Sequence, residues 1–357
     1  MKKIAIVGFH SLHLMQFLYK YTEILDKHSI DYDVIYWDRN VDTSIKYKPF
    51  NGNKIAFHYK MDNYQPKRKK IVGFIRCVIF SYHTLIKGNY ERVIFLTTQT
   101  ILPLNLYAKF KEKKYIYDYR DVTYEHNQRI KTIIKNLIEK SYVTYMSSLG
   151  FKEILGENQK IMIAHNCSNL RYEAVEKKLS DEIRIVFWGM IRQIEFHKKI
   201  CDCFGNKNRF KVFYHGEGSG DMLRAYCASQ SYNNIHFQGR YTTDEITTFA
   251  STTDILLNLY DNDWQQKNAL TVKMYDAIRY NLPMLVTAGS YMENFFYDND
   301  AVYAVEIGKL DVDAIVGWFK SLDKNRYMYA KELKQIQADD AKFEEIFLNF
   351  CTGDDKK

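Results

Sequence analysis

The chain has 357 residues, of which 46% are hydrophobic and 26% are charged, a balance typical of a folded globular protein. At roughly 150 residues per domain, this length predicts two domains. The net charge of +8 is uneven, because residues 1–165 carry 27 basic and 15 acidic residues and the remainder has a net charge of −4. We therefore expect an anionic partner for the first half, and we exclude nucleic acid as a partner of the whole chain.

Hydrophobic patterning predicts alternating strands and helices through both halves of the chain. In the first half, strands are predicted at 4–7, 32–37, 55–59, 92–96, 115–119, 143–147 and 161–164. Helices are predicted between them at 12–27, from about 67, at 102–110 and at 130–140. In the second half, strands are predicted at 183–188, 210–214, 235–238, 255–259 and 284–287. Helices are predicted there at 198–204, 221–228, 244–250, 272–280 and 324–350.

This alternation predicts an α/β protein made of two Rossmann-like, doubly wound units. The boundary should fall in the segment 165–182, which is polar and has no strand periodicity. We therefore expect an N-terminal domain at 1–168 and a second domain at 169–325. A helical segment at 326–357 is expected to pack back on the first domain.

Cysteine usage and hydropathy bear on the location of the protein. The six cysteines are scattered without a C-x-x-C pair, which predicts reduced thiols, a cytoplasmic location and no metal site. The longest apolar stretch, 71–86, contains Arg76 and His83, and we expect it to be too short and too polar to span a bilayer.

The N-terminal apolar run is short and is broken by His10, Ser11 and His13. It therefore predicts a first buried strand rather than a signal peptide.

Four consecutive basic residues precede that apolar stretch: Lys67, Arg68, Lys69 and Lys70. A basic amphipathic helix can lie on an anionic membrane surface. A helix that packs in the core and has a charged first turn is the alternative. The basic charge of the first half favours peripheral membrane contact.

Four features in the second half follow one another in an order that suggests a ligand site at the carboxyl ends of parallel strands. The first is a glycine turn at Gly189 followed by Arg192 and Lys198, for which ordinary surface charges are the alternative. The second is a loop with Gly216 and Gly218, whose spacing does not fit a dinucleotide fingerprint. Glycines there let backbone N–H groups approach a ligand, although a tight turn needs them as well.

The third feature is the predicted strand end at Gly239, followed by Arg240 and Tyr241. A nucleobase could lie against this backbone. A helix capping box formed by the next few residues is the structural alternative.

The fourth feature is a helix that starts near Leu270 and Thr271. Its free backbone N–H groups and positive dipole end suit a phosphate, and Lys273 adds charge in the first turn. Asp276 shares a face with Lys273 and suits the vicinal hydroxyls of a ribose. An i, i+3 salt bridge between these two residues is the alternative.

Together these residues resemble the nucleotide-sugar glycosyltransferases of GT-B fold, particularly the retaining, family-4-like enzymes that build bacterial capsules, exopolysaccharides and lipopolysaccharides. In that family an Arg and a Lys after the first strand of the second domain clamp the donor diphosphate, which matches Arg192 and Lys198. The family's late motif is K-x-Y-E-x-x-x-x-G-x-P. It is matched, with Asp in place of Glu and Asn in place of Gly, by Lys273, Tyr275, Asp276, Asn281 and Pro283.

Two positions depart from the family pattern. One of two glutamates common in the family is Asn268 here, and an amide can hydrogen-bond a sugar hydroxyl but cannot act as a carboxylate. The first strand ends in Gly8 and Phe9 rather than in a glycine pair.

The first half supplies candidates for binding an acceptor. The segment 118–121 looks like the D-x-R-D segment of similar enzymes. This resemblance implies that Asp121 orients the acceptor and that Arg120 lies near a phosphate. An internal Asp–Arg pair that holds a loop is the alternative. His10 and His13, in the first loop, are further candidates for acceptor contact.

We therefore expect a glycosyltransferase that moves a sugar from a nucleotide-diphosphate donor to a saccharide, with a lipid-linked acceptor favoured. Arg192, Lys198 and Lys273 would stabilise the leaving diphosphate. Asp276 would hold the ribose and Asn268 would touch the donor sugar. Because fixed cations and a helix N-terminus can stabilise the leaving diphosphate by themselves, we expect neither a metal nor a cofactor. A GT-B-fold epimerase and a non-catalytic partner of another transferase are the alternatives.

Overall fold

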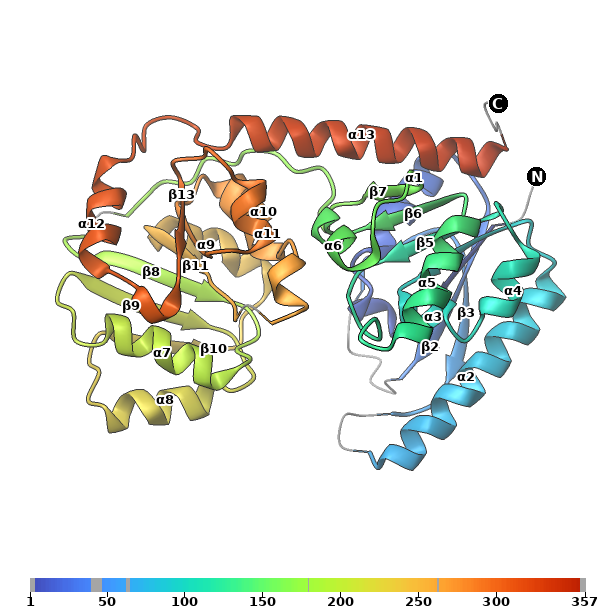
Figure 1. Cartoon of the computed structure of the whole chain (residues 1–357), viewed down its shortest axis with the longest axis horizontal. Coiled ribbons are helices and arrows are strands. Elements are labelled where there is room, and N and C mark those ends of the chain that lie inside the picture. The colour runs from blue at the N-terminus through green and yellow to red at the C-terminus, as the bar shows by residue number, and fades with distance from the viewer. Residues whose placement is uncertain (1–3, 40–46, 62–64, 179, 262, 354–357) are drawn as a thin grey trace. The chain divides into compact units, whose positions relative to one another are not determined.

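The computed structural model describes residues 4–39, 47–61, 65–178, 180–261 and 263–353. The chain divides into two compact units. Unit 1 comprises Met1–Ser168 and Ala338–Lys357, and unit 2 comprises Asn169–Gln337. Each unit is built on a parallel β-sheet flanked by helices (Figure 1).

In its described part, unit 1 has a seven-stranded parallel sheet in the order β3-β2-β1-β4-β5-β6-β7. Its strands are β1 (Ile4–Gly8), β2 (Tyr32–Asp38), β3 (Asn53–His58), β4 (Arg92–Leu96), β5 (Tyr115–Tyr119), β6 (Val143–Met146) and β7 (Ile161–Ile163). Its α-helices are α1 (Leu18–Lys27), α2 (Lys67–Gly88), α3 (Thr98–Ile101), α4 (Asn105–Phe110), α5 (Gln128–Lys140), α6 (Lys152–Leu155) and the second part of α13 (Ala330–Thr352).

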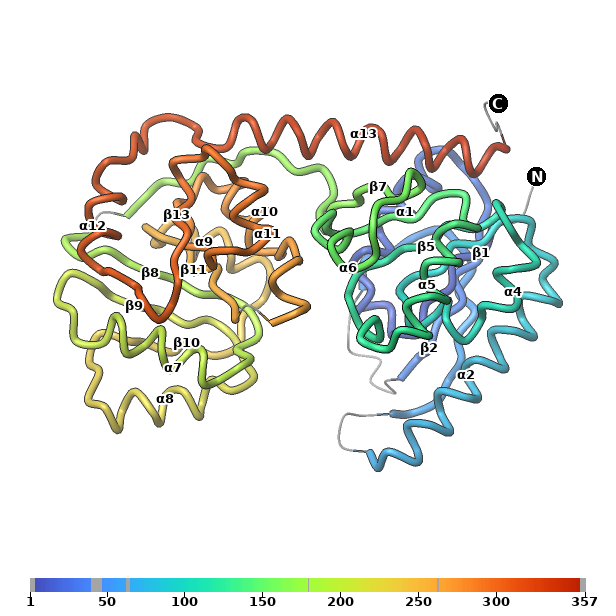
Figure 2. Tube along the Cα trace, in the orientation of Figure 1, coloured from blue at the N-terminus to red at the C-terminus, as the bar shows by residue number. Residues whose placement is uncertain are grey.

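Unit 2, where it is described, has a six-stranded parallel sheet in the order β10-β9-β8-β11-β12-β13. Its strands are β8 (Ile183–Trp188), β9 (Phe210–His215), β10 (Ile235–Gly239), β11 (Ile255–Asn258), β12 (Met284–Thr287) and β13 (Val302–Val305). Its α-helices are α7 (Ile194–Phe204), α8 (Gly220–Ser229), α9 (Ile246–Thr252), α10 (Val272–Tyr280), α11 (Tyr291–Phe295) and α12 (Val312–Ser321). Figure 2 follows the same trace, in which α7 and α8 lie side by side, as their packing contacts also show.

Both sheets reverse their strand order at one point, between β1 and β4 in unit 1 and between β8 and β11 in unit 2. Ligands of open α/β sheets bind at the carboxyl ends of the strands beside such a switch point. The central strands are buried along their whole length, as in parallel sheets covered on both faces. The prediction of an α/β protein with two Rossmann-like units is therefore confirmed.

Some predicted elements differ from the structure. The helix predicted at 12–27 is a 3₁₀ turn (Leu12–Leu14) followed by α1. The helix predicted at 102–110 is shorter in the structure, where α4 begins at Asn105, two residues after Pro103, which cannot donate a helical hydrogen bond. The final helix begins at Ala330 rather than 324, and unit 2 extends to Gln337. The strand β13 and the helices α3, α6, α11 and α12 were not predicted.

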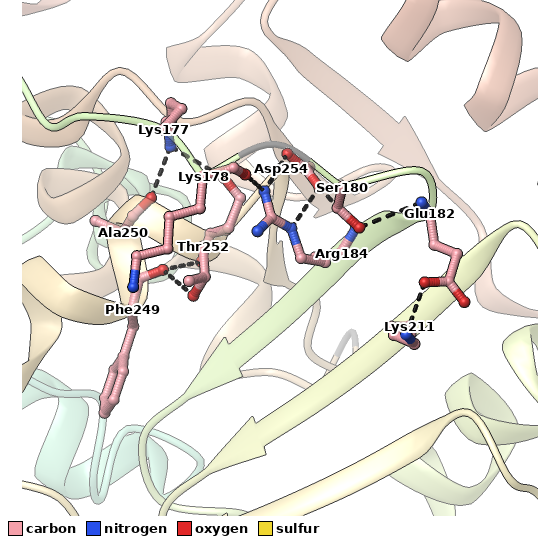
Figure 3. Close-up of polar contacts among 11 residues, drawn as sticks. Lys177, Lys178, Ser180, Glu182, Arg184, Lys211, Phe249, Ala250, Thr252 and Asp254 are labelled. Carbon is pink, nitrogen blue, oxygen red and sulfur yellow. Dashed lines mark hydrogen bonds and ion pairs between the residues drawn. The ribbon is translucent and has the colours of Figure 1, made fainter.

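The amino ends of the unit 2 strands are held by charged side chains (Figure 3). Arg184 at the start of β8 binds both carboxylate oxygens of Asp254, through Nε at 3.0 Å and Nη2 at 3.1 Å. Lys177 donates to the carbonyl oxygens of Ala250 and Thr253, where α9 ends. These contacts attach the segment after the unit boundary to the edge of the sheet opposite the glycine loops.

α2 is longer than the apolar stretch identified in the sequence. It has 22 residues and, in the described chain, is the one helix whose length and composition are sufficient to cross a membrane. The stretch 71–86 was expected to be too short to span a bilayer, but the helix also includes the basic turn before that stretch and two residues after it. Only 22% of the most apolar 18-residue segment of α2 is buried within the protein.

Candidate functional site

Glycine loops follow the three strands β8, β9 and β10 at the carboxyl edge of the unit 2 sheet. The Gly189 N–H donates to the carbonyl oxygen of His215 at 2.9 Å, and the Gly216 N–H donates to that of Gly239 at 2.6 Å. The three loops are thus joined side by side through their backbones. The structure brings together the glycines that the sequence predicted.

Close backbone packing explains why two of these positions are glycine. At Gly216, where φ is +146°, a Cβ would lie 1.8 Å from the carbonyl oxygen of Gly189. At Gly218, where φ is +96°, a Cβ would lie 2.4 Å from the carbonyl oxygen of Ile191. At Gly239 the φ of +78° favours glycine, although a Cβ would meet nothing within 4 Å. The edge therefore presents backbone rather than side chains.

Lys273, in the first turn of α10, is a buried cation beside these loops. It is 6% exposed, and its ammonium donates to the hydroxyl of Tyr260. The same ammonium lies 4.2 Å from the ring centroid of Phe187, and a Cβ on Gly189 would be 3.7 Å from it. Within the described part of the chain, no carboxylate lies within 4 Å of it. A buried ammonium without an acidic partner favours an anionic ligand.

The start of α10 leaves backbone donors beside that ammonium. Thr271 is the N-cap residue, but its hydroxyl donates to the amide oxygen of Asn258 at 2.9 Å and does not cap the helix. The N–H groups of Val272 and Lys273 and the positive dipole end of α10 are therefore available to an anion, whereas the Met274 N–H donates to the carbonyl oxygen of Thr271 at 3.3 Å. Asn268 and Leu270, just before this turn, are buried. A small cavity of about 10 Å³ lies beside Thr271 and Tyr260.

Asp276 lies one turn after Lys273 on α10. Its carboxylate accepts a hydrogen bond of 2.9 Å from the indole N–H of Trp188. Burial raises the pKa of Asp276, and the Trp188 hydrogen bond and the charges of Arg279 and Lys273 oppose that shift. No salt bridge joins Asp276 to Lys273 in the described structure, so the alternative given for this pair is not observed.

Tyr241 lies close to this carboxylate. Burial, followed by the charge of Asp276, raises the pKa of the Tyr241 hydroxyl. Its ring packs edge-on against Phe249, which also stacks on His215 with the ring centroids 3.8 Å apart. The capping box forms between Thr242 and Glu245, so the structural alternative for this segment is observed, and the nucleobase contact stays a prediction.

The sequence did not single out His197 and Tyr260, which complete the surroundings of Lys273. His197 is buried against the rings of Phe187 and Tyr214, with centroids 5.1 and 5.6 Å away. Burial and then the charge of Lys273 lower the pKa of His197 to about 4, so the imidazole is neutral at pH 7. An aromatic residue after a strand and a histidine on a helix also fit ordinary core packing, so no sequence signal marked them.

Among the described residues, the structure shows no contact between Lys273 and the other two predicted cations. Arg192 is exposed in the loop after β8, and no ion pair is found for it in the described residues. Lys198 forms a 2.8 Å salt bridge with Glu195 and lies 5.1 Å from the ring centroid of Tyr226 on α8. Arg240 is exposed and lies 3.9 Å from Glu217. The diphosphate contacts of Arg192 and Lys198 stay predictions.

In unit 1, Arg120 at the carboxyl end of β5 is committed to internal contacts. It forms a buried ion pair with Asp118, and its Nη1 donates to the carbonyl oxygen of Ala164 and the amide oxygen of Asn166, both at 2.8 Å. These contacts correspond to the structural alternative, a pair that holds a loop. Asp121 is exposed at the same edge of the sheet.

His10 lies in the loop after β1, at the switch point of the unit 1 sheet. Burial and then the charge of Arg39 lower its pKa to about 4, and a hydrogen bond with Gln99 opposes the shift. Arg39 is held by the carbonyl oxygen of Phe9 at 2.6 Å. His13 is partly exposed in the 3₁₀ turn that follows. The loop thus offers a neutral imidazole beside a fixed guanidinium.

In the parts of the chain that the structure describes, no group of three His, Cys, Asp or Glu side chains is placed to hold a metal ion. Metal independence stays a prediction.

No protein-family model matches the chain, and neither does the sequence of any curated protein. Solved structures do match along the whole length. A sucrose-phosphate synthase from Thermosynechococcus elongatus has a TM-score of 0.73 at 11% identity, covering 99% of this chain and 100% of that one. HepE from Anabaena, in complex with UDP and glucose, has a TM-score of 0.65 at 9% identity, covering 97% and 99%.

A third match is the lipopolysaccharide outer core galactosyltransferase WaaB. Its TM-score is 0.62 at 14% identity, with 99% of each chain covered. These structures share the arrangement of two Rossmann-like domains, so the chain has the GT-B fold that the sequence predicted.

Proposed function

We propose that the chain is a glycosyltransferase that transfers a sugar from a nucleotide-diphosphate donor to a saccharide hydroxyl. The observation that carries this proposal is Lys273, a buried ammonium without an acidic partner in the described residues, beside the Gly189 loop and the free end of α10. The GT-B fold and the UDP-glucose complex of HepE support it.

In this proposal the diphosphate binds between the Gly189 backbone and the first turn of α10. Backbone N–H groups and the Lys273 ammonium stabilise the charge that develops as the bond between the sugar and the diphosphate breaks. Because these groups are fixed by packing, they need no reorganisation during the reaction. We propose that Arg192, on its exposed loop, adds a contact to the diphosphate once the donor is bound.

Recognition of the nucleoside falls to residues on the same edge. Asp276 accepts hydrogen bonds from the ribose hydroxyls, and the backbone at 239–241 lies against the base. The Asn268 amide contacts the sugar. Because the Asn268 side chain cannot act as a carboxylate, catalysis in this proposal depends on stabilising the departing diphosphate.

The acceptor is proposed to bind at the carboxyl edge of the unit 1 sheet. There the neutral imidazole of His10 can exchange hydrogen bonds with a hydroxyl, and exposed Asp121 can orient the attacking hydroxyl and receive its proton. Retention of configuration, a lipid-linked acceptor and a role in bacterial surface polysaccharide synthesis belong to this proposal through the family resemblance.

Calorimetric titration with UDP, GDP, ADP, CDP and TDP tests the donor site. At least one should bind, and Lys273→Met should weaken it about 10- to 100-fold, the effect of losing a charge-assisted hydrogen bond. The corresponding nucleoside should bind equally to both proteins. Lys199→Met, which removes an exposed ammonium of α7, is the matched control. Unchanged diphosphate affinity in Lys273→Met would refute the site.

A second experiment separates the alternatives. Incubation with the sugar nucleotide of the base that binds best should consume the donor only when a saccharide acceptor is present. An isomerised donor formed without acceptor would indicate an epimerase. Binding without any turnover across an acceptor panel would indicate the non-catalytic partner, which the amide at Asn268 favours.

A further inference from the structure

One side of α2 is an apolar surface that the rest of unit 1 leaves exposed. Its five large aliphatic side chains are each 43–63% exposed: Ile71, Val72, Ile75, Ile79 and Ile86. At about 100° per residue, these positions fall within an arc of about 100° around the helix. The opposite side packs on unit 1 and consists of the buried residues Gly73, Cys77, Ser81 and Leu85. α2 is therefore apolar on two faces, of which the protein covers one.

The neighbouring helix α4 enlarges this surface. Tyr107 of α4 contacts α2 through its ring, 6.0 Å from that of Tyr82, and through its hydroxyl, which donates to the carbonyl oxygen of Leu85 at 3.3 Å. On the outer side of α4, Leu106 is 58% exposed and Phe110 is 83% exposed. We call the five aliphatic residues of α2 together with these two the α2–α4 surface.

Positive charge accompanies the α2–α4 surface. α2 contains no Asp or Glu, and its first turn consists of the run from Lys67 to Lys70. Arg76, Lys87 and Lys109 are exposed farther along the two helices. A second copy of the chain would bring like charges against this face, whereas an anionic bilayer offers both an apolar interior and complementary headgroups.

We propose that the α2–α4 surface inserts into the interfacial layer of an anionic lipid bilayer, with α2 lying in the plane of the membrane. Packing of the inner face keeps α2 from spanning the bilayer. A Cβ on Gly73 would lie 2.7 Å from the ring of Tyr59 and 3.0 Å from that of Trp37, so the helix is closely fitted to the sheet. A spanning helix would lose these contacts.

Membrane insertion has a consequence for the acceptor, which rests on the proposed function. Phe74 of α2 packs edge-on against Phe9, with ring centroids 5.7 Å apart. His10, the next residue, is the proposed acceptor contact. The helix that enters the membrane therefore touches the loop that binds the acceptor. This arrangement suits a saccharide carried on a membrane lipid better than a soluble one.

Vesicle flotation tests the proposal with phosphatidylglycerol–phosphatidylcholine and pure phosphatidylcholine vesicles. The wild-type chain should float with the anionic vesicles. Ile75→Ser with Ile79→Ser should lower its partition coefficient by at least about tenfold, since two aliphatic side chains no longer enter the bilayer. Met222→Ser with Tyr297→Ser, which removes two exposed apolar side chains of unit 2, is the matched control and should change little.

Charge variants separate the two contributions. Replacing Lys67, Arg68, Lys69 and Lys70 with Gln should reduce binding to anionic vesicles by about fivefold per charge and leave the weak binding to phosphatidylcholine unchanged. Thermal unfolding and nucleoside-diphosphate titration should be unaffected in every variant, which keeps this test independent of the donor site.

Three results would overturn the proposal. Flotation of the Ile75→Ser, Ile79→Ser protein equal to that of wild type would exclude the α2–α4 surface. A wild-type dimer that this variant dissociates, without vesicle binding, would identify the surface as a contact between copies. Retention of the wild-type chain on membranes after alkaline carbonate would indicate a spanning helix.

Discussion

The carboxyl edges of the two sheets each hold a buried cation, but the two cations are compensated differently. In unit 1, Arg120 is 4% exposed and is paired with buried Asp118 and with backbone and amide oxygens. In unit 2, Lys273 is 6% exposed and contacts a phenol and aromatic ring faces, and no carboxylate of the described residues lies within 4 Å of its ammonium. Buried cations at the carboxyl edges of two similar sheets therefore serve different purposes.

This difference separates structural charge from charge available to a ligand. An ion pair with its remaining hydrogen bonds satisfied holds the chain together, and removing one partner leaves the other charge buried and unpaired. A buried ammonium that only aromatic groups surround still lacks an anion, so its charge is available for binding. By this criterion Arg120 is a structural residue and Lys273 is a binding residue.

The largest effect expected from this comparison is on folding. Arg120→Met leaves the Asp118 carboxylate unpaired at 0% exposure and should lower the free energy of unfolding by about 3–5 kcal/mol. Lys273→Met should change it by less than about 1 kcal/mol. Urea denaturation measures both, and adding Asp118→Leu to Arg120→Met should restore part of the loss. Similar costs for the two single variants would abolish the distinction.

The second prediction concerns the neutral histidines beside the cations, His10 near Arg39 and His197 near Lys273. Each has its pKa lowered to about 4 from 6.5, so the unfolded chain binds a proton first as the pH falls. Their contribution to stability is therefore complete above pH 6.5 and is lost between about pH 6.5 and 4.

A shift of this size corresponds to up to about 3 kcal/mol per histidine at pH 4. His10→Gln and His197→Gln should each flatten the decline in unfolding free energy over this range. Denaturation at several pH values measures the slope. A slope equal to that of wild type would show that the histidine is protonated in the folded protein as readily as in the unfolded chain.

Much of this architecture is predictable from sequence because its signals are local. Strand runs, the glycines after three strands and Lys273 at a helix start each depend on a few neighbouring residues, and the structure brings them together. The helix predicted at 102–110 begins only at Asn105, because Pro103 favours a helix start over a helix interior.

The rest depended on contacts between distant segments. Whether Lys198 meets a ligand or Glu195, and whether Arg120 meets an acceptor or Asp118, is decided by the direction of a side chain after packing. Tyr260 is separated from Lys273 by 13 residues, and their contact requires the fold to place the end of β11 beside α10. The exposed face of α2 has the same composition as a buried one, so only the structure could show that it is uncovered.

A third prediction compares two glycines of the donor edge. Both have positive φ, but a Cβ on Gly216 would clash with the Gly189 carbonyl, whereas one on Gly239 would meet nothing within 4 Å. Gly239→Ala should cost about 1 kcal/mol of stability from backbone strain alone. Gly216→Ala should cost about 2 kcal/mol and should also weaken nucleotide binding, because the Gly189 loop must move. Thermal unfolding measures the stability of both variants, and calorimetric titration measures their nucleotide affinity. Equal losses in the two variants would argue against the close packing of the Gly189 and Gly216 loops.

The smallest effect concerns Asp276, whose proposed ligand is the ribose. Burial raises its pKa, so its ionised form is less favourable in the folded protein than in the unfolded chain. Asp276→Asn retains an acceptor for Trp188 and should therefore leave the unfolding free energy unchanged or slightly higher at pH 7.

Its effect should appear in ligand discrimination instead. The wild-type protein should bind the preferred nucleoside diphosphate about tenfold more tightly than its 2′-deoxy and 3′-deoxy analogues, since a carboxylate accepts from both hydroxyls of a ribose. Asp276→Asn should lower this ratio toward one while the affinity of the deoxy compounds stays the same. An unchanged ratio would remove Asp276 from the ribose site and leave Lys273 as the residue on which the donor proposal depends.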